Sequence, residues 1–212
     1  MEITKTQIAV FAYRSMPNRP LEAWLDRIRV GGGHVRYAPD TSPVELAREQ
    51  VCNRFLEEDA PAGRTHLLMI DGDMVPLAAS DRTAGTAPIL TADGEMIYCG
   101  FVGREGMAGH WGDDDFGMAC CRLSADVLRG VAKPWFPLSI DGDRHVGCEC
   151  LAFFARAVQA GVASRMAGSV GHLQHIVLFP DRQGRVASTW PWQAAESAED
   201  VPIDAQTGGS EP

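Results

Sequence analysis

The sequence predicts a single-domain α/β protein, because signals for short buried strands alternate with signals for amphipathic helices along most of its 212 residues. Hydrophobic residues make up 45% of the chain, enough for a substantial core at a length close to that of one domain. We place this domain at residues 1–180. Residues 181–212 are polar and acidic, and we expect them to form a partly disordered tail.

Strands are expected at three places in the first third of the chain. Residues 7–13 and 34–38 are short runs with strand composition. Residues 66–70, "HLLMI", are too short for a helix and predict a buried strand that ends at Asp71. Alternating sheets of this kind bind ligands beyond the carboxyl ends of their strands, so the position of Asp71 suits a site.

Two helices are expected between these strands. Residues 20–30 begin with a proline and end at the glycines 31–33, as a helix should. Residues 42–58 predict a second helix, with Ser42 as N-cap and Glu45 completing a capping box. The apolar stripe of this second helix is Val44, Ala47, Val51 and Phe55.

The second half of the chain continues the alternation. Residues 88–101 have hairpin character, and residues 116–123 predict a strand before a short helix capped by Ser124. Residues 148–161 predict another helix, which ends at Gly161. Its expected core face is Leu151, Phe154, Ala155 and Val158.

Charge and composition limit the partners and the compartment. The formal net charge of −9 repels nucleic acid phosphates unless a local basic patch offsets it. The first residues lack the order of a secretory signal, and no apolar run approaches the ~20 residues that span a bilayer. The six cysteines include no C-x-x-C pair. We therefore expect a soluble, cytoplasmic protein with reduced thiols and no membrane span.

The segment Asp71-Gly72-Asp73 has two interpretations. Asp-Gly is a favoured hairpin turn, and it recurs at residues 93–94 and 141–142. The first copy differs because it follows a buried strand. Two carboxylates two residues apart in extended chain point to the same side, where one can hold a divalent cation directly and the other through water or substrate phosphate oxygens. This context favours a metal site over a turn.

Six segments follow one another in an order that is informative: "LAREQVCNRFL", "THLLMIDGDMVP", "FGMACCRLSADVL", "KPWF", "CECLAFFARAVQAG" and "SVGHLQH". This order resembles that of nucleotide-sugar glycosyltransferases of the GT-A fold. The likeness spans residues 7–176 and implies a Rossmann-like domain with a mixed central sheet flanked by helices.

The resemblance implies a donor site. Asp71 and Asp73 would be the Asp-x-Asp motif that binds Mn or Mg together with the donor diphosphate. His172 would be the third metal ligand, with His175 as a weaker second choice. Arg48 would lie near the donor, although the family's next residue, an Asn, is a Glu in this chain.

The resemblance also implies an acceptor-side carboxylate pair, from which this sequence departs. Glu149 and Cys150 occupy the positions of the family's Glu-Asp pair. In inverting members that Asp deprotonates the acceptor hydroxyl, and a thiol is not a natural general base. Either Glu149 acts as base, or another carboxylate substitutes, or the transfer retains configuration, or the protein is inactive. The other candidate carboxylates are Asp141, Asp143 and those of Asp113–Asp115.

Three further residues have a functional and a structural interpretation. Tyr13 and Arg14 follow the first strand, where a nucleotide base would bind, but an exposed loop explains them equally well. Trp135 could stack on an acceptor sugar, although a buried aromatic is the commoner fate of "PWF".

A structural zinc site is the alternative from another class. Its ligands would come from His145, Cys148, Cys150 and the Cys120-Cys121 pair, but C-x-C lacks the usual C-x₂₋₄-C spacing. A third reading is a binding protein that kept the fold and lost catalysis, which Cys150 suggests.

We expect a metal-dependent glycosyltransferase that moves a sugar from a nucleoside-diphosphate donor to an acceptor hydroxyl. A uridine diphosphate sugar is the default donor for an Asp-x-Asp enzyme. Small relatives of this kind occur in bacteria and their phages, with glycans, proteins or modified DNA bases as acceptors. The acidic net charge argues against the last of these.

Overall fold

The computed structural model describes residues 3–12, 18–39, 43–79, 84–102, 118–137, 140–141, 144–145 and 149–172. The strands are β1 (Thr6–Phe11), β2 (His34–Tyr37), β3 (His66–Asp71), β4 (Met74–Pro76), β5 (Met96–Val102), β6 (Cys120–Ser124), β7 (Ile140–Asp141), β8 (Arg144–His145) and β9 (Ser164–His172). The helices are η1 (Ile3–Lys5), α1 (Arg19–Val30), α2 (Val44–Arg54), the π-helical turn η2 (Phe55–Asp59), α3 (Pro88–Thr91), α4 (Ala125–Gly130) and α5 (Glu149–Gln159).

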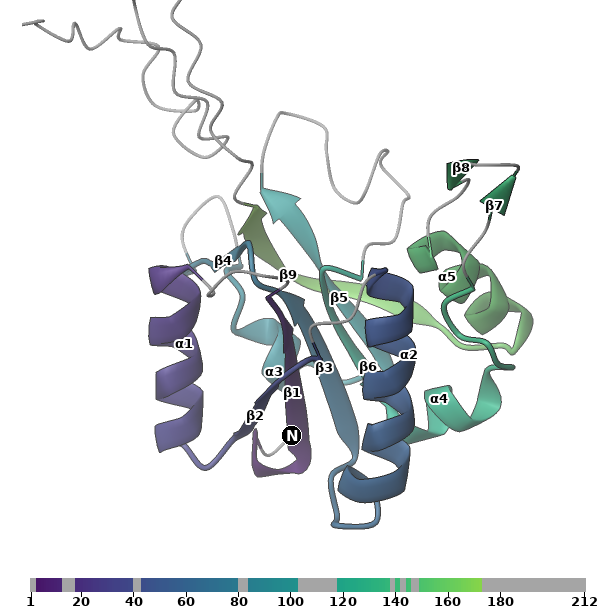
Figure 1. Ribbon diagram of the computed structural model, residues 1–212. Helices are drawn as coiled ribbons and strands as arrows, with labels where there is room; N and C mark the ends of the chain where they lie inside the picture. The colour runs from purple at the N-terminus through teal and green to yellow at the C-terminus, as the bar shows by residue number, and fades with distance from the viewer. Residues whose placement is uncertain are drawn as a thin grey trace, which may run out of the picture.

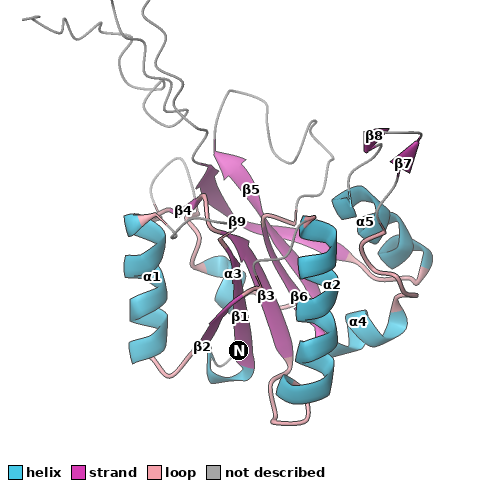
Figure 2. Cartoon of the chain, in the orientation of Figure 1, coloured by secondary structure: helices cyan, strands magenta, loops and turns pink. Residues whose placement is uncertain are grey.

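Seven of these strands form one mixed sheet in the order β2-β1-β3-β6-β5-β9-β4, and helices cover both faces (Figures 1 and 2). The α/β fold class with a mixed central sheet is therefore confirmed. The first three strands of that order are mutually parallel, β6 runs against both of its neighbours, and β5 and β9 are parallel. The carboxyl ends of β1, β3, β5 and β9 consequently meet at one edge of the sheet.

The sheet is buried on both faces, which explains the continuous apolar runs in its central strands. All six residues of β1 are buried. Alternate residues point to opposite faces, so Ile8 and Val10 pack on the α1 side whereas Ala9 and Phe11 pack on the α2 side. Helix α1 contributes Leu21, Trp24, Leu25 and Ile28 to the first of these two core clusters.

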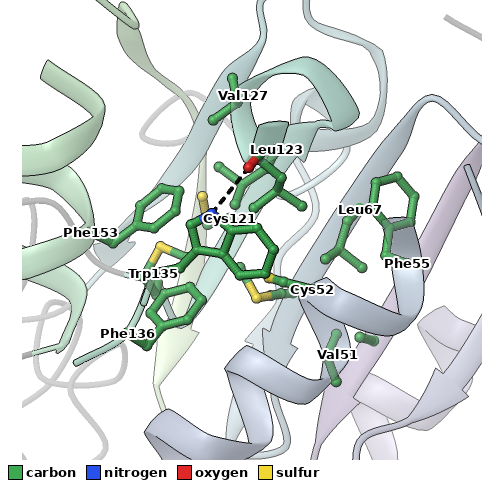
Figure 3. Packing of buried hydrophobic residues seen from close by; sticks show 14 of the residues in the cluster. Val51, Cys52, Phe55, Leu67, Cys121, Leu123, Val127, Trp135, Phe136 and Phe153 are labelled. Atoms are coloured by element: carbon green, nitrogen blue, oxygen red, sulfur yellow. Dashed lines mark hydrogen bonds between the residues drawn. The ribbon is translucent and has the colours of Figure 1, made fainter. Parts of the chain in front are cut away.

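The second core cluster centres on Trp135, which is only 1% exposed (Figure 3). Its indole nitrogen donates hydrogen bonds to the carbonyls of Leu128 and Val131, at 3.1 and 3.0 Å. Next to it, the rings of Phe136 and Phe153 stack with centroids 5.2 Å apart. This cluster attaches α4 and α5 to the face of the sheet that α2 covers.

Two expectations about local structure are wrong. Helix α2 begins at Val44, because Pro43 has an extended ψ of 168° and occupies the N-cap position without a side-chain hydrogen bond. The N-cap of this helix is therefore Pro43 and not Ser42, which lies outside the described residues. Residues 88–101 do not make a hairpin: Pro88–Thr91 is a short helix, and the strand that follows pairs with β6 and β9.

The core face of α5 also differs from the expected one. Cys150, Phe153 and Ala157 are buried, whereas Leu151 and Val158 are 41% and 54% exposed. Both sets of residues follow helical spacing, because this helix is apolar on more than one side. Periodicity alone could not choose between the two faces, and the choice is made by packing against Phe136.

Candidate functional site

The segment Asp71–Asp73 lies at the carboxyl edge of the sheet, between two strands that do not pair with each other. β3 pairs with β1 and β6, whereas β4 pairs with β9. Residues 72–73 therefore form a turn, as the Asp-Gly pair suggests, but this turn does not join the two paired strands of a hairpin. The backbone of the segment is fixed by hydrogen bonds from Asp71 N to the carbonyl of Ala119 and from Gly72 N to that of Phe11, both 2.8 Å.

Gly72 and Asn18 hold this segment against the start of α1. A Cβ at Gly72 would lie 3.0 Å from the Cα of Ala12, which leaves little room for any side chain. The amide nitrogen of Asn18 donates to the carbonyls of Gly72 (3.1 Å) and Met74 (2.8 Å). Its oxygen accepts the backbone N–H of Leu21 as the N-cap of α1. One side chain thus links the helix start to the Asp-x-Asp segment.

Arg48 reaches Asp71 from the second helix. Its Nη2 donates to Oδ1 and Oδ2 of Asp71, at 3.0 Å each, and its Nε lies 3.7 Å from Oε1 of Glu149. The guanidinium carbon lies 5.3 Å from the centre of the Phe11 ring. The Arg48 side chain is only 4% exposed, so a buried cation joins a carboxylate from β3 to one from α5.

The surroundings change the pKa values of both partners. Burial raises the pKa of Asp71 to about 6, Arg48 opposes this shift, and the charges of Asp73 and Glu149 reinforce it. Burial disfavours the charge of Arg48, but Asp71, Cys150 and Glu149 together raise its pKa above the usual value. Arg48 therefore stays charged, whereas the pKa of Asp71 lies closer to neutral pH than that of an ordinary aspartate.

Glu149 and Cys150 form the first turn of α5 beside Arg48. The Glu149 side chain is 12% exposed. Cys150 is 3% exposed, and its Sγ donates to Oε1 of Glu149 at 3.4 Å. The residues that the resemblance selected from three distant segments, Arg48, Asp71 and the 149–150 pair, thus lie together at the carboxyl edge of the sheet.

The remaining expected site residues are only partly described, or lie outside the described part of the chain. The Cα of His172 pairs with Met74, so the backbone of β9 ends beside Asp73. The description of His172 is limited to its backbone. Outside the described residues lie Tyr13, Arg14, Asp113–Asp115, Asp143, Cys148 and His175.

The expectation that Trp135 stacks on an acceptor sugar is wrong. Its side chain is buried, with the indole N–H bonded to two carbonyls and Lys133 Nζ lying 4.4 Å from the ring centre. It therefore offers no open face to an acceptor and acts as a core residue.

The described cysteines do not assemble a zinc site. Cys120 and Cys121 are adjacent on one strand and belong to the two core clusters on opposite faces of the sheet. Burial raises the pKa of Cys121 far above its usual value, which disfavours the thiolate that zinc requires. The neighbouring pair cannot serve one metal ion together.

Asn18 and Glu49 are two residues whose roles the sequence did not reveal. Glu49 stands where the resemblance expects an Asn, and its Oε2 accepts the backbone N–H groups of Trp135 and Phe136, at 3.0 and 3.1 Å. The signal for Asn18 was its place just before the proline that opens α1. Glu49 had no local signal, since its partners lie 86 and 87 residues away.

The carboxylates at this edge fit a metal site that substrate phosphates complete, and they do not fit a site formed by protein ligands alone. Within the part of the chain that the structure describes, no group of three or more His, Cys, Asp or Glu could hold a metal ion. These residues therefore do not form an all-protein cage. Mg²⁺ is commonly held by one or two carboxylates together with substrate phosphates, and the exposed Asp73 beside Asp71 fits that arrangement.

Three solved structures are similar to this chain. The crystal structure of A197 from STIV superposes with a TM-score of 0.54 at 13% identity, covering 87% of this chain and 93% of that one. A glycosyltransferase involved in the glycosylation of the major capsid of PBCV-1 gives a TM-score of 0.39 at 14% identity, covering 80% and 93%. The inositol-1-phosphate CTP transferase from T. maritima gives 0.40 at 8% identity, covering 80% and 89%.

At the level of sequence, no protein-family model and no curated protein matches this chain. The likeness to A197, at 13% identity, shows a shared fold and no activity. Among the described residues, no helix is long and apolar enough to span a membrane.

Proposed function

We propose that the protein is a metal-dependent glycosyltransferase that moves a sugar from a nucleoside-diphosphate donor, by default a uridine diphosphate sugar, to an acceptor hydroxyl. The observation that supports this most is the meeting of Asp71, Arg48 and Glu149 at the carboxyl edge of the sheet. A ligand site is expected at this edge in alternating α/β folds. The sequence resemblance points to the same residues independently of the fold.

The donor side is assigned to the two aspartates. Asp73 is exposed and would bind the cation that accompanies the donor diphosphate. Asp71 already accepts from Arg48 through both oxygens, so its role is to position the segment and to add negative charge next to the cation. When bound, Mn or Mg would stabilise the charge that develops on the leaving diphosphate.

The acceptor side is assigned to Glu149. Its carboxylate is 12% exposed and lies 3.7 Å from Arg48, which keeps it on the same side of the site as Asp71. A carboxylate in this position can take the proton of an acceptor hydroxyl. The thiol of Cys150 donates to Glu149 and is buried, so Cys150 positions the base and does not replace it.

A binding protein without catalysis is the second candidate, and Cys150 in place of the family's Asp supports it. The two candidates share the donor site and differ only in turnover. Release of sugar from a bound donor would exclude the second candidate. Tight donor binding without any release or transfer would favour it.

The first experiment is calorimetric titration with a panel of nucleoside diphosphates and their sugars, each with Mn and with chelator. We expect one nucleotide to bind only when Mn is present. Turnover of that donor is then followed with water and with candidate acceptors. If no nucleotide binds under either condition, the donor-site proposal is overturned, and the fold has been kept without this chemistry.

A further inference from the structure

A single side chain holds the backbone on both sides of Asp73, the exposed carboxylate of the Asp-x-Asp segment. The side-chain nitrogen of Asn18 donates to the carbonyl of Gly72 at 3.1 Å and to the carbonyl of Met74 at 2.8 Å. The backbone nitrogen of Asn18 also lies 3.4 Å from the Gly72 carbonyl. Asp73 therefore lies between two carbonyls that are bound to one residue from a distant part of the chain.

The Asn18 amide uses its donors and its acceptor at the same time. Its Oδ1 accepts the backbone N–H of Leu21 at 3.0 Å. Carbonyls can only accept and a backbone N–H can only donate, so these contacts fix the direction of the amide. An aspartate would lack both donors, and a serine hydroxyl carries one hydrogen and cannot serve two carbonyls. The double contact therefore requires a primary amide.

Asn18 is a firm anchor because the helix that it caps is packed in the core. Its carbonyl accepts the N–H of Glu22 at 3.0 Å, which begins the helical hydrogen bonds of α1. Leu21 is fully buried, and Met74 lies in the same core cluster with 1% of its surface exposed. Polar contacts from Asn18 thus join β4 to α1 in addition to apolar packing.

The strand that follows Asp73 is short and lies at the edge of the sheet. β4 consists of Met74–Pro76, and it is the last strand in the sheet order, paired with β9. Before Asp73, the N–H of Gly72 is bound to the carbonyl of Phe11. A short edge strand restrains a neighbouring turn weakly, so the contacts from Asn18 add order where the sheet adds little.

We propose that Asn18 is a positioning residue for the donor metal: by holding the carbonyls on either side of Asp73, it keeps this carboxylate where the cation binds and so sets the affinity for Mn. This inference rests on the proposed function. Order that is present in the free protein does not have to be imposed when a ligand binds. Loss of a residue that orients a metal ligand typically lowers metal affinity by about 10–100-fold, and we expect an effect of this size at Asn18.

The variant that tests this is Asn18→Ser, studied by calorimetry with the nucleotide that the panel identifies. Serine is a good N-cap, so it keeps the acceptor for Leu21 and loses the double contact. The Mn concentration at half-maximal nucleotide binding should rise by about tenfold or more, whereas binding should still be stoichiometric at saturating Mn.

Ser124→Ala is the matched control. The Oγ of Ser124 accepts the N–H of Val127 at 3.1 Å as the N-cap of α4, so this variant also loses a capping interaction, but at a helix start that does not contact the Asp-x-Asp segment. Its Mn requirement should equal that of the wild type. An equal rise in Asn18→Ser and in this control would assign the effect to a general loss of stability and reject the positioning role.

A second measurement needs neither metal nor turnover. In the metal-free protein, ¹⁵N relaxation should give lower backbone order parameters at residues 72–74 in Asn18→Ser than in the wild type, with no change there in Ser124→Ala. Asn18→Gly removes the side chain and still caps the helix at a small cost, so it serves as a second variant if the serine does not fold or its hydroxyl keeps one of the two contacts.

The outcomes separate this inference from the proposed function. If the wild type binds a nucleotide with Mn, and the folded variants show its Mn requirement and its order parameters unchanged, the positioning role is overturned and the donor site stands. If the wild type binds no nucleotide with Mn, both proposals are overturned together.

Discussion

Nη2 of Arg48 lies 3.0 Å from both carboxylate oxygens of Asp71 at the end of β3, where Arg48 is 4% and Asp71 is 25% exposed. The same guanidinium lies 3.7 Å from Glu149. Without this cation, two acidic side chains would face each other in a poorly solvated space. Arg48 therefore has a structural role and a role in the proposed site. Its variants need a measurement of stability as well as one of donor binding.

The structural role predicts a large loss of stability in Arg48→Met. Arg48 is 4% exposed and Asp71 is 25% exposed, so removing the cation should cost up to about 3–5 kcal/mol, the value for a fully buried pair. Arg54→Met is the matched control on the same helix, since its pair with Glu58 is exposed and should cost below about 1 kcal/mol. Urea denaturation of both variants measures the difference. Equal stabilities would show that Asp71 and Glu149 are already well solvated in the folded protein.

The donor assignment predicts that Asp73→Asn lowers metal-dependent nucleotide binding by about tenfold or more, because a neutral amide is a weaker ligand for a hard cation. Asp93→Asn is the control, because Asp93 is also exposed and also belongs to an Asp-Gly pair. Calorimetry with and without chelator gives the comparison. A similar effect of both substitutions would point to net charge rather than to a specific ligand.

The sequence predicted much of this site because its parts follow local rules. Asp71 ends a buried apolar strand, and the resemblance selected Arg48, Glu149 and Cys150 on the helices that the periodicity had already marked. The contacts that these residues make with one another could not be predicted from the sequence. The ion pair of Arg48 with Asp71 joins positions 23 residues apart, and its geometry depends on how α2 crosses the sheet.

Other features could not be predicted because they depend on tertiary packing. Leu151 lies on the exposed side of α5. The apolar residues of this side recur at the same helical spacing as those of the buried side, so the sequence pattern does not distinguish the two sides. Trp135 is an aromatic residue of the kind that can stack on a sugar. In the structure, however, carbonyls at the end of α4 accept its indole N–H in the core. Asn18 gains its second role only when β3 ends beside α1.

The raised pKa of Asp71 predicts a pH dependence of donor binding. Burial raises this pKa to about 6, so lowering the pH from 7 to 5 should protonate Asp71 and weaken Mn-dependent binding by about tenfold. The nucleotide sugar is the ligand to titrate, because its diphosphate is esterified at both ends and lacks the ionisation near pH 6 of a terminal phosphate. Asp71→Asn should show a flatter profile. Equal slopes in both proteins would assign the titration to another group.

The raised pKa of Asp71 also predicts the direction in which stability changes with pH. An acid whose pKa is raised on folding binds its proton more tightly in the folded state, so its contribution to stability decreases as the pH rises from about 4 through 6. Asp71→Asn should remove this part of the slope of the unfolding free energy against pH. Denaturation at several pH values measures it, and an unchanged slope would contradict the assignment to Asp71.

The base assignment predicts unequal effects of two neighbouring substitutions. Glu149→Gln should lower the turnover of the donor that the nucleotide panel identifies by about 10²–10⁴-fold, the usual contribution of a general base. Cys150→Ser keeps a donor toward Glu149 and should retain turnover within a few-fold. Steady-state rates with donor at saturation compare them. The opposite ranking would make Cys150 the essential group, and full activity in both would place the base elsewhere.

The hydrogen bonds of Glu49 predict an effect on stability that does not depend on the proposed chemistry. Its Oε2 accepts the N–H groups of Trp135 and Phe136, so Glu49→Ala leaves these backbone donors without their acceptor and should cost about 1–3 kcal/mol. Glu49→Gln keeps an acceptor oxygen and should lose less. Glu57→Ala, an exposed residue one helical segment later, is the control and should be nearly neutral. Urea denaturation ranks the three variants. If Glu49→Ala proves as stable as the control, water replaces the carboxylate at these amides, and the indole hydrogen bonds of Trp135 and the stacking of Phe136 on Phe153 are enough to hold this segment.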